Sequence, residues 1–449
     1  MIQTPIIGSM GIRHGRALLA GASLIVLLSG CMSDGLPFPT RNAIDPTGIT
    51  APKPGAARLP GTTAQSSSVI ADLETRRSVL PASGPYAQIA TAVLDHSAGP
   101  AQADLRVARL TAKAKSKNWM PQIGPSISLS SLDQLVSQLV VDQVLFDNGA
   151  KKAEREFAAA DVEVAAVGLS QEMNDEVYDG LKFYVSSLKA QAQSQVGTQS
   201  AAEMAEFERI LRERAKGGLS DLSEVRIVAQ KRAEAQAEAD ADRDASNAAL
   251  AQLRAMTGAP LTGLSGLSQI TLPVDTPEAL DVKLAQSEQA RANAEAKLAR
   301  AGHRPSLGVK ATAGSGNPSV GLNMGMTQML GFGRSDTLAA LDAQIDAADT
   351  RVADSRQKAE RRQAALHAKL SALEGQSAHD AALVEQAESG LELFKRQYQM
   401  GRRRLMELVS NYESYAALKR AEVALQYDIA LIKLDLAREH GILVDGSRI

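Results

Sequence analysis

The chain has 449 residues, a formal net charge of −2, seven phenylalanines, one tryptophan and one cysteine. So few large aromatic side chains argue against a large aromatic-filled core, and the nearly balanced charge argues against nucleic acid as a partner. The single cysteine excludes an internal disulfide and a zinc site made of cysteines.

Residues 1–30 have the pattern of a secretory signal. Positive charges at Arg13 and Arg16 precede the apolar run ALLAGASLIVLL, which is too short to span a bilayer as a mature helix. The sequence Leu-Ser-Gly-Cys that ends at Cys31 resembles the lipobox of a bacterial lipoprotein signal. This resemblance implies cleavage before Cys31 and lipidation of that residue, and Met32 favours sorting to the outer membrane. The alternative is a secreted protein with a chance cysteine.

Residues 31–84 are predicted to be a disordered tether anchored by its lipid. Segments such as DPTGITAPKPGAARLPGTT are dense in Pro, Gly and Thr. Such a composition cannot bury enough apolar surface to offset the entropy of the chain.

Beyond the tether, the sequence predicts two copies of one unit. Landmarks recur in matching contexts at a separation of 183 or 184 residues. They are Pro121 with Pro305, Gly149 with Gly333, Gly218 with Gly401, and Gly258 with Gly441. We therefore expect a first repeat over 85–260 (helix, two strands, long helix, tip, helix), an equatorial linker over 261–276, a second repeat over 277–443 and a tail over 444–449.

Each copy contains a run that favours one very long helix. Residues 151–216 and 335–400 lack proline and are rich in Ala, Glu, Gln, Lys, Arg and Leu, and their apolar residues step by three and four. At about 1.5 Å per residue each helix would be roughly 100 Å long. A long coiled-coil rod would explain these runs alone, but it would require heptads from end to end.

The period changes to two just before each long helix. In the second copy, 306–313 and 320–327 alternate around the turn 314–318, and the first copy offers 126–132 and 134–146. One expected face holds Leu307, Val309, Leu322 and Met324, and the other holds Lys310 and Asn323. Each strand has about the length of a tilted barrel strand, and open sheet edges cannot face lipid. The strands form either a soluble sheet or a barrel pooled from several chains, and the lipoprotein signal favours the barrel.

This order of elements resembles the TolC family of outer-membrane efflux proteins. The residues that carry the resemblance are Pro121, Leu145-Phe146, Gly149, Gly218-Leu219 and Glu224-Val225 in the first copy, and Pro305, Gly333, Gly401 and Glu407-Leu408 in the second. It implies a mainly α fold with a small β part. Duplicated long-helix hairpins of a homotrimer would form an α-helical barrel in the periplasm, capped by a transmembrane β-barrel to which three chains give four strands each.

The resemblance also implies a function and partners. The protein would be the passive outer-membrane exit duct of a tripartite efflux system, in contact with outer-membrane lipid and energised by an inner-membrane pump through a periplasmic adaptor protein. Two alternatives stay open: the outer-membrane component of type I protein secretion, and a lipid-anchored periplasmic coiled-coil scaffold.

The two corners between the helices are the predicted tip. The resemblance maps the adaptor contact to Gly217, Gly218 and Leu219 and to Met400, Gly401 and Arg402, where an arginine replaces a short side chain. In a trimer the corners alternate around the tip, so arginines of one chain would lie near acids of the next. The gate candidates are Asp221, Glu224, Arg403, Arg404, Glu385 and Glu388, with Glu224 and Arg403 proposed as a latch of the closed state. The alternative for the arginines is a solvated corner.

The sequence offers no site for catalysis. Its six histidines are scattered without metal-ligand spacing, and it has neither a phosphate-cradling loop nor a nucleophile elbow. We therefore expect no enzyme activity, no cofactor and no bound metal.

The lipidation assignment predicts that Cys31→Ser loses acylation while much of the protein remains in the outer membrane, because the barrel supplies its own apolar belt. Metabolic labelling with palmitate should give a signal in the wild type and none in the variant. A variant that keeps the label would contradict the assignment.

Overall fold

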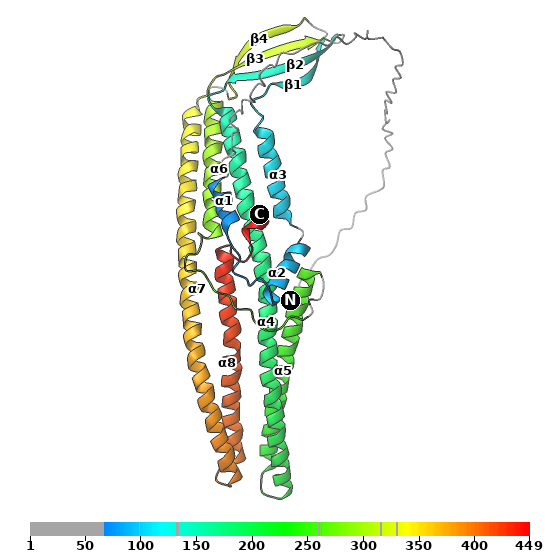
Figure 1. Ribbon diagram of the computed structural model, residues 1–449, viewed down its shortest axis with the longest axis vertical. Coiled ribbons are helices and arrows are strands. Elements are labelled where there is room, and N and C mark those ends of the chain that lie inside the picture. The colour runs from blue at the N-terminus through cyan, green and yellow to red at the C-terminus, as the bar shows by residue number, and fades with distance from the viewer. Residues whose placement is uncertain are drawn as a thin grey trace, which may run out of the picture. The chain divides into compact units, whose positions relative to one another are not determined.

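Two long helices dominate the computed structural model (Figure 1). Helix α4 spans Ala150–Lys216 and helix α7 spans Arg334–Gln399. Both lie within one residue of the predicted bounds, because neither run contains a proline and glycines flank both helices. Gly149 and Gly217 flank α4, and Gly333 and Gly401 flank α7.

The structure describes residues 67–449 except 98, 132–133, 259–260, 262, 315–316 and 329–330. These residues belong to one compact unit, residues 62–449. The predicted signal peptide, Cys31 and most of the predicted tether lie outside the described residues.

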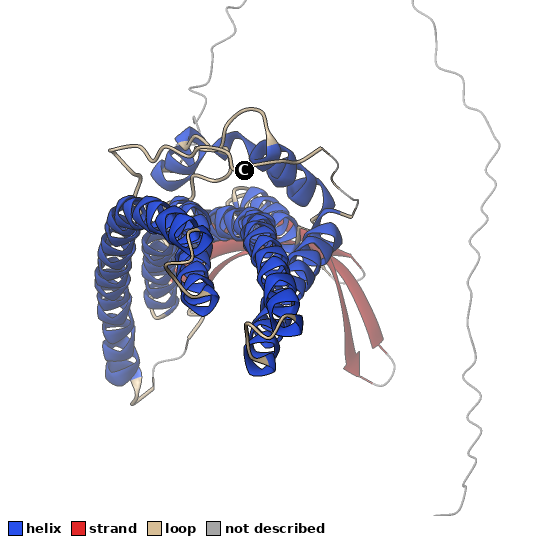
Figure 2. Ribbon diagram, turned by 90° about the horizontal axis from the view of Figure 1, so that it is seen from below, coloured by secondary structure: helices blue, strands red, loops and turns tan. Residues whose placement is uncertain are grey.

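Shorter helices lie beside the long ones and give a wall one helix thick (Figures 1 and 2). Helix α5, Leu222–Thr257, returns along α4, and α8, Leu405–Glu439, returns along α7. Helix α3, Pro100–Lys115, and α6, Leu280–Gly302, occupy the half nearer the strands. Packing gives the order α7-α8-α4-α5 in the half with the corners and α7-α6-α4-α3 in the half with the strands.

The duplication is visible in the backbone, with one clear departure. Gly218 and Gly401 both have φ of 72°, a conformation that glycine adopts without strain. The single helix expected at the start of the first repeat is instead two helices, α2 over Pro85–His96 and α3. The break falls at Gly99, whose φ is 54°, because Pro100 can begin a helix but cannot continue one.

Four strands form one antiparallel sheet in the order β1-β2-β3-β4. They are β1, Gln122–Ser131; β2, Gln134–Phe146; β3, Ser306–Gly314; and β4, Ser319–Gly325. The two copies meet where β2 pairs with β3. Strand β1 begins four residues before the predicted start, because it is an edge strand and tolerates Pro125.

The largest core cluster lies halfway along the wall. Its fully buried side chains include Tyr86 of α2, Val177 and Leu181 of α4, and Leu434 of α8. Leu443, just beyond α8, packs against the same cluster. We call this level the equatorial region.

The predicted tether, residues 31–84, extends too far towards the C-terminus. Residues 67–84 are ordered: helix α1 spans Ser68–Thr75, and Leu73 is fully buried. The predicted tail also packs, since a 3-10 helix covers Gly446–Arg448 and the Gly446 N–H donates to the Arg76 carbonyl at 2.9 Å. The dense Pro and Gly residues end before α1, so their composition does not apply to this segment.

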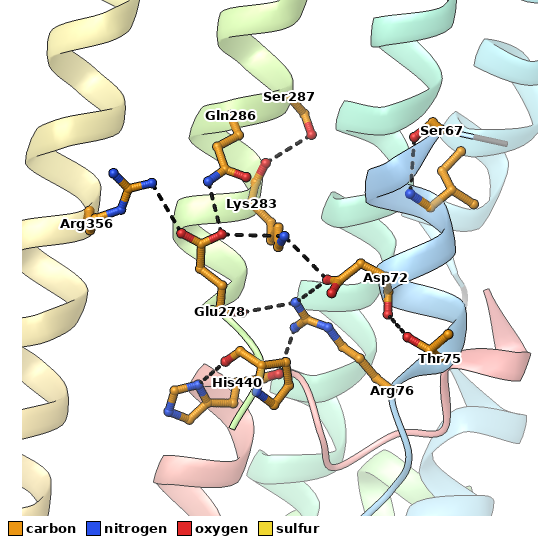
Figure 3. A network of polar contacts seen from close by, with 12 residues as sticks. Ser67, Asp72, Thr75, Arg76, Glu278, Lys283, Gln286, Ser287, Arg356 and His440 are labelled. Carbon is orange, nitrogen blue, oxygen red and sulfur yellow. Dashed lines mark hydrogen bonds and ion pairs between the residues drawn. The ribbon is translucent and has the colours of Figure 1, made fainter. Parts of the chain in front are cut away.

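Arg76 fastens this segment to the second repeat (Figure 3). Its buried guanidinium donates to the carbonyls of His440 at 2.7 Å and Glu278 at 3.0 Å, and to the Asp72 carboxylate at 2.9 Å. Lys283 adds a contact of 3.7 Å to Asp72. Burial lowers the pKa of His440, so its ring is neutral near pH 7 and Nδ1–H donates to a backbone carbonyl at 2.7 Å.

Arg76→Ala is expected to destabilise the fold by roughly 2–3 kcal/mol, because it leaves buried carbonyl acceptors without a donor. Arg77→Ala is the matched control, since the Arg77 side chain is 74% exposed and makes one loose ion pair of 3.3 Å. Circular dichroism of purified protein should give a lower thermal midpoint for Arg76→Ala only. Equal midpoints for the two variants would contradict the assignment.

Candidate membrane sheet and helical corners

The two corners have the same backbone hydrogen bonds. At the α4/α5 corner, Gly218 N–H donates to the Ala215 carbonyl at 3.0 Å and Leu219 N–H to the Arg214 carbonyl at 2.8 Å. At the α7/α8 corner, the residues 183 positions later make the equivalent bonds, both at 2.9 Å. Each pair of bonds is a Schellman motif, which ends a helix through a left-handed glycine. The predicted tip residues are therefore the turns themselves.

The corners differ in how the returning helix begins. Asp221 caps α5, and the Ser223 N–H that donates to its carboxylate at 3.1 Å holds the pKa of Asp221 below its usual range. Arg404 stands at the same position before α8 and provides no side-chain cap. The carboxylate of Asp221, predicted as a gate candidate, thus has a local structural role.

Arg403 is held within its own hairpin. Its Nε–H donates to Gln397 at 3.0 Å, a terminal nitrogen donates to the Glu407 carboxylate at 3.0 Å, and its guanidinium lies 4.9 Å from the centre of the Phe394 ring. Arg402 and Arg404 are exposed and make no ion pair with any described residue.

The predicted acidic gate residues lie at two levels. Glu224 sits in the first turn of α5, half-buried and without an ion pair to any described residue. Glu385 and Glu388 are exposed on α7, roughly 18–22 Å along the helix from Met400 at about 1.5 Å per residue. The single chain brings none of these three acids into an ion pair with the arginines of the corner.

A tightly packed cluster holds the two hairpins together just above the corners. It contains Phe207 and Leu211 of α4, Val228 of α5, and Leu405 and Val409 of α8. In contrast, Leu219, Leu222 and Met400 are 72%, 65% and 59% exposed. The corners therefore present apolar side chains to their surroundings from a rigid base.

Ion pairs across a groove also join the hairpins, and the sequence analysis missed them. The groove, of about 660 Å³, is lined by α4, α5 and α8. On its walls Lys231 pairs with Glu413, and Arg420 pairs with Asp242 and, at 3.0 Å, with Glu238. Opposite charges about one repeat apart would have been the signal, because equivalent residues of the two hairpins lie at the same level.

The sheet has one apolar face and one polar face, as the alternation predicted. Strands β3 and β4 pair Leu307 with Met324 and Val309 with Leu322, while Lys310 lies opposite Gly321 on the other face. Paired residues in an antiparallel sheet point to the same side. The apolar face is uncovered in the single chain, since Leu322 and Met324 are 75% and 76% exposed.

The first copy contributes to the same two faces less regularly. Val141 pairs with Ala311 and with Ile123 on the apolar face, and Asp142 pairs with Lys310 on the polar face. Gln143 falls on the apolar face, but its amide donates to the backbone carbonyls of Trp119 and Val144 at 3.0 and 2.9 Å. These bonds satisfy its polar group, which explains why the weaker alternation still gives a continuous face.

Exposed aromatic side chains mark the junctions between strands and helices. Trp119 precedes β1, Phe146 ends β2 and Phe332 precedes α7, and their exposed fractions are 59%, 59% and 110%. Aromatic girdles of this kind border the apolar band of membrane β-proteins. Trp119 and Phe332 were not singled out from the sequence, and Phe146 was used only for the family resemblance, although three of only eight Phe and Trp residues occur at these junctions.

None of the helices in the described part of the chain is long and apolar enough to cross a membrane. No group of three His, Cys, Asp or Glu side chains within this part of the chain has the arrangement of a metal site.

Long paired hairpins beside a sheet with one uncovered apolar face define this fold, and solved structures of outer-membrane proteins share it. The outer membrane protein VceC from Vibrio cholerae matches with a TM-score of 0.69 and 19% identity over 80% of this chain and 96% of that chain. The open state of the MtrE outer membrane channel from Neisseria gonorrhoeae matches with a TM-score of 0.65 and 15% identity over 84% of this chain and 94% of that chain.

A membrane protein from Pseudomonas aeruginosa matches with a TM-score of 0.71 and 15% identity over 89% of this chain and 98% of that chain. No family model matches the sequence, and no curated protein matches it. The predicted TolC-type fold, mainly α with a small β part, is therefore confirmed by structural likeness.

The two faces of the sheet predict a labelling pattern in liposomes. Asn323→Cys should react with a membrane-impermeant maleimide, whereas the adjacent Leu322→Cys should be protected by lipid. Leu322→Arg should cost roughly 2–4 kcal/mol if this residue lies near the bilayer midplane. The reverse labelling pattern would mean that the faces are exchanged.

The aromatic junctions predict where the only tryptophan lies. Fluorescence of Trp119 in liposomes should be quenched more by lipids brominated near the head group than by lipids brominated near the bilayer centre. A Trp119→Phe/Phe394→Trp variant moves the fluorophore close to a corner and should resist both quenchers. Quenching of Trp119 by neither lipid would contradict an interfacial position.

Proposed function

We propose that the protein is the outer-membrane exit duct of a tripartite efflux system, a passive channel that works with a periplasmic adaptor and an inner-membrane pump. The observation that carries this proposal is the uncovered apolar face of the sheet, attached directly to a wall of long helices. A water-filled duct needs lipid-facing strands outside and a polar surface inside, and the two faces of the sheet have these properties.

Assembly with other copies follows from the edges of the sheet, and the family resemblance sets the number of copies at three. In one chain, β1 and β4 each have only one neighbouring strand. Backbone groups without partners cannot face lipid, so the edges must pair with other copies. Three copies of the sheet give a closed barrel of twelve strands, and three copies of the helical wall continue it as a tube in the periplasm. A lipid on Cys31 adds a second attachment to the outer membrane.

The energy for export must come from another protein, because the sequence offers no nucleotide-binding motif. The corners are the adaptor surface in this proposal. They combine a rigid apolar base with exposed groups at Leu219, Gly401 and Arg402.

Two other functions compete with efflux. Type I protein secretion would use the same duct, and efflux is preferred to it because lipidated members of the family that the sequence resembles mostly serve efflux. A lipid-anchored coiled-coil scaffold would leave the apolar face of the sheet uncovered. The duct is preferred to the scaffold because the similar solved structures include outer membrane channels.

Planar bilayer recordings of the purified full-length protein test the duct directly. We expect discrete conductance steps, because a closed barrel leaves a continuous water path. The Leu322→Arg variant, which places a charge on the lipid-facing side, is the matched control and should insert far less often. A wild-type protein that inserts but gives no conductance would support the scaffold.

The proposed latch between Glu224 and Arg403 of a neighbouring chain predicts a charge swap. Arg403 uses one N–H on Gln397 and one on Glu407, which leaves three N–H donors for another carboxylate. Three symmetric pairs of about 0.2–1 kcal/mol each act on one closure equilibrium. Glu224→Arg should therefore raise the resting conductance several-fold, and Glu224→Arg/Arg403→Glu should restore closure.

Glu234→Arg is the control for the latch, since this residue is exposed further along the same helix. It should leave the resting conductance unchanged. A double variant that leaks as much as Glu224→Arg would show that Glu224 and Arg403 are not partners.

A further inference from the structure

The two corners share one backbone but differ sharply in charge. Residues 213–224 and 396–407 are equivalent segments of the two repeats. The first segment carries Arg214 and Lys216 against Glu213, Asp221 and Glu224, and the second carries Arg396, Arg402, Arg403 and Arg404 against Glu407. The α7/α8 corner is thus strongly cationic, and the α4/α5 corner is slightly anionic.

The cations of the two corners also differ in whether they have partners. At the α4/α5 corner, Lys216 pairs with Glu213 at 2.9 Å. At the α7/α8 corner, only Arg403 has a carboxylate, that of Glu407. Arg402 and Arg404 are exposed and lack an ion pair with any described residue. Three guanidinium groups per chain therefore have no carboxylate partner among the described residues, that of Arg396 in the last turn of α7 and those of Arg402 and Arg404 in the turn itself.

The helix that follows strengthens the positive potential. The N-terminus of a helix carries the positive end of its dipole, and an acidic cap normally offsets it. Asp221 does so for α5, but Arg404 occupies the equivalent position of α8. The free guanidinium groups and the helix end thus favour an anionic partner together.

A neighbouring copy of the chain cannot supply enough carboxylates. The α4/α5 corner that would lie beside the arginines in a trimer has one acid without a partner, Glu224, because Glu213 pairs with Lys216 and Asp221 caps α5. Even with Glu224 engaged, at least one guanidinium per chain remains without a counter-charge.

We propose that the α7/α8 corner, through Arg402 and Arg404, docks onto carboxylate side chains of the periplasmic adaptor, whereas the α4/α5 corner docks through Leu219 and Leu222. This assignment rests on the proposed exit duct and adds the chemistry of its partner. The adaptor surface must alternate between acidic and apolar positions around the ring, in register with the two corners. Such alternation would fix the rotational position of the adaptor on the trimer, because a shift by one hairpin would place apolar groups against arginines.

The test uses a fluorescein-labelled decamer of glutamate as an acidic probe and a decamer of glutamine as its neutral counterpart. Fluorescence anisotropy on purified full-length protein should show binding of the acidic peptide only, weakened by added salt. Arg402→Gln/Arg404→Gln should reduce the affinity roughly fivefold or more, since it removes the two unpaired cations of each turn and leaves only Arg396 of the unpaired arginines at this corner. The matched control is Arg254→Gln/Arg361→Gln, which removes two exposed arginines far from the corner. This control should bind the peptide like the wild type.

Equal binding by Arg402→Gln/Arg404→Gln and by the control would overturn the proposal. A raised resting conductance of Arg402→Gln/Arg404→Gln with undiminished peptide binding would also overturn it, because the arginines would then belong to the latch. The duct and the docking surface are tested by different results. Loss of peptide binding in a variant that still conducts supports the docking proposal. A wild-type protein without conductance contradicts the duct, whether or not it binds the peptide.

Discussion

Unpaired backbone groups at a sheet edge are the constraint on which the proposed architecture depends. The described part of each chain folds into one four-stranded sheet, with β1 and β4 at its two edges. In lipid the N–H and C=O groups of these edges would have no partners, so an isolated sheet with an apolar face cannot be inserted. Closure by other copies solves this problem. It also sets the geometry of the periplasmic part, since α4 and α7 begin only a few residues after the strands and must continue the ring that the strands close.

The long helices and the second pair of strands were predictable because their signals are local. Absence of proline and three-four spacing defined α4 and α7, and strict alternation defined β3 and β4. The N-terminal segment was not predictable in this way. Helix α1 is only 8 residues long and is held by Arg76, whose acceptors lie about 200 and 360 residues away. No local pattern reports such contacts, so composition alone extended the tether too far.

The corners show a similar division. Their glycines predicted two equivalent turns, and the Schellman bonds confirm the equivalence. The partners of the arginines were harder to predict from the sequence, although Arg403 and Glu407 have the i,i+4 spacing of a helical ion pair. Duplication thus preserves the backbone while the side chains diverge. One corner ends in leucines and a capped helix, and the other ends in free guanidinium groups, so in the proposed trimer a ring of six corners would distinguish two kinds of surface on a partner.

The subunit count of the purified protein tests the central claim most directly. Native mass spectrometry of the detergent-solubilised, full-length protein should show a complex of three chains that survives release from the detergent micelle, because each chain completes the sheet of its neighbours. A population made only of monomers would contradict the account, since every sheet would then keep two open edges.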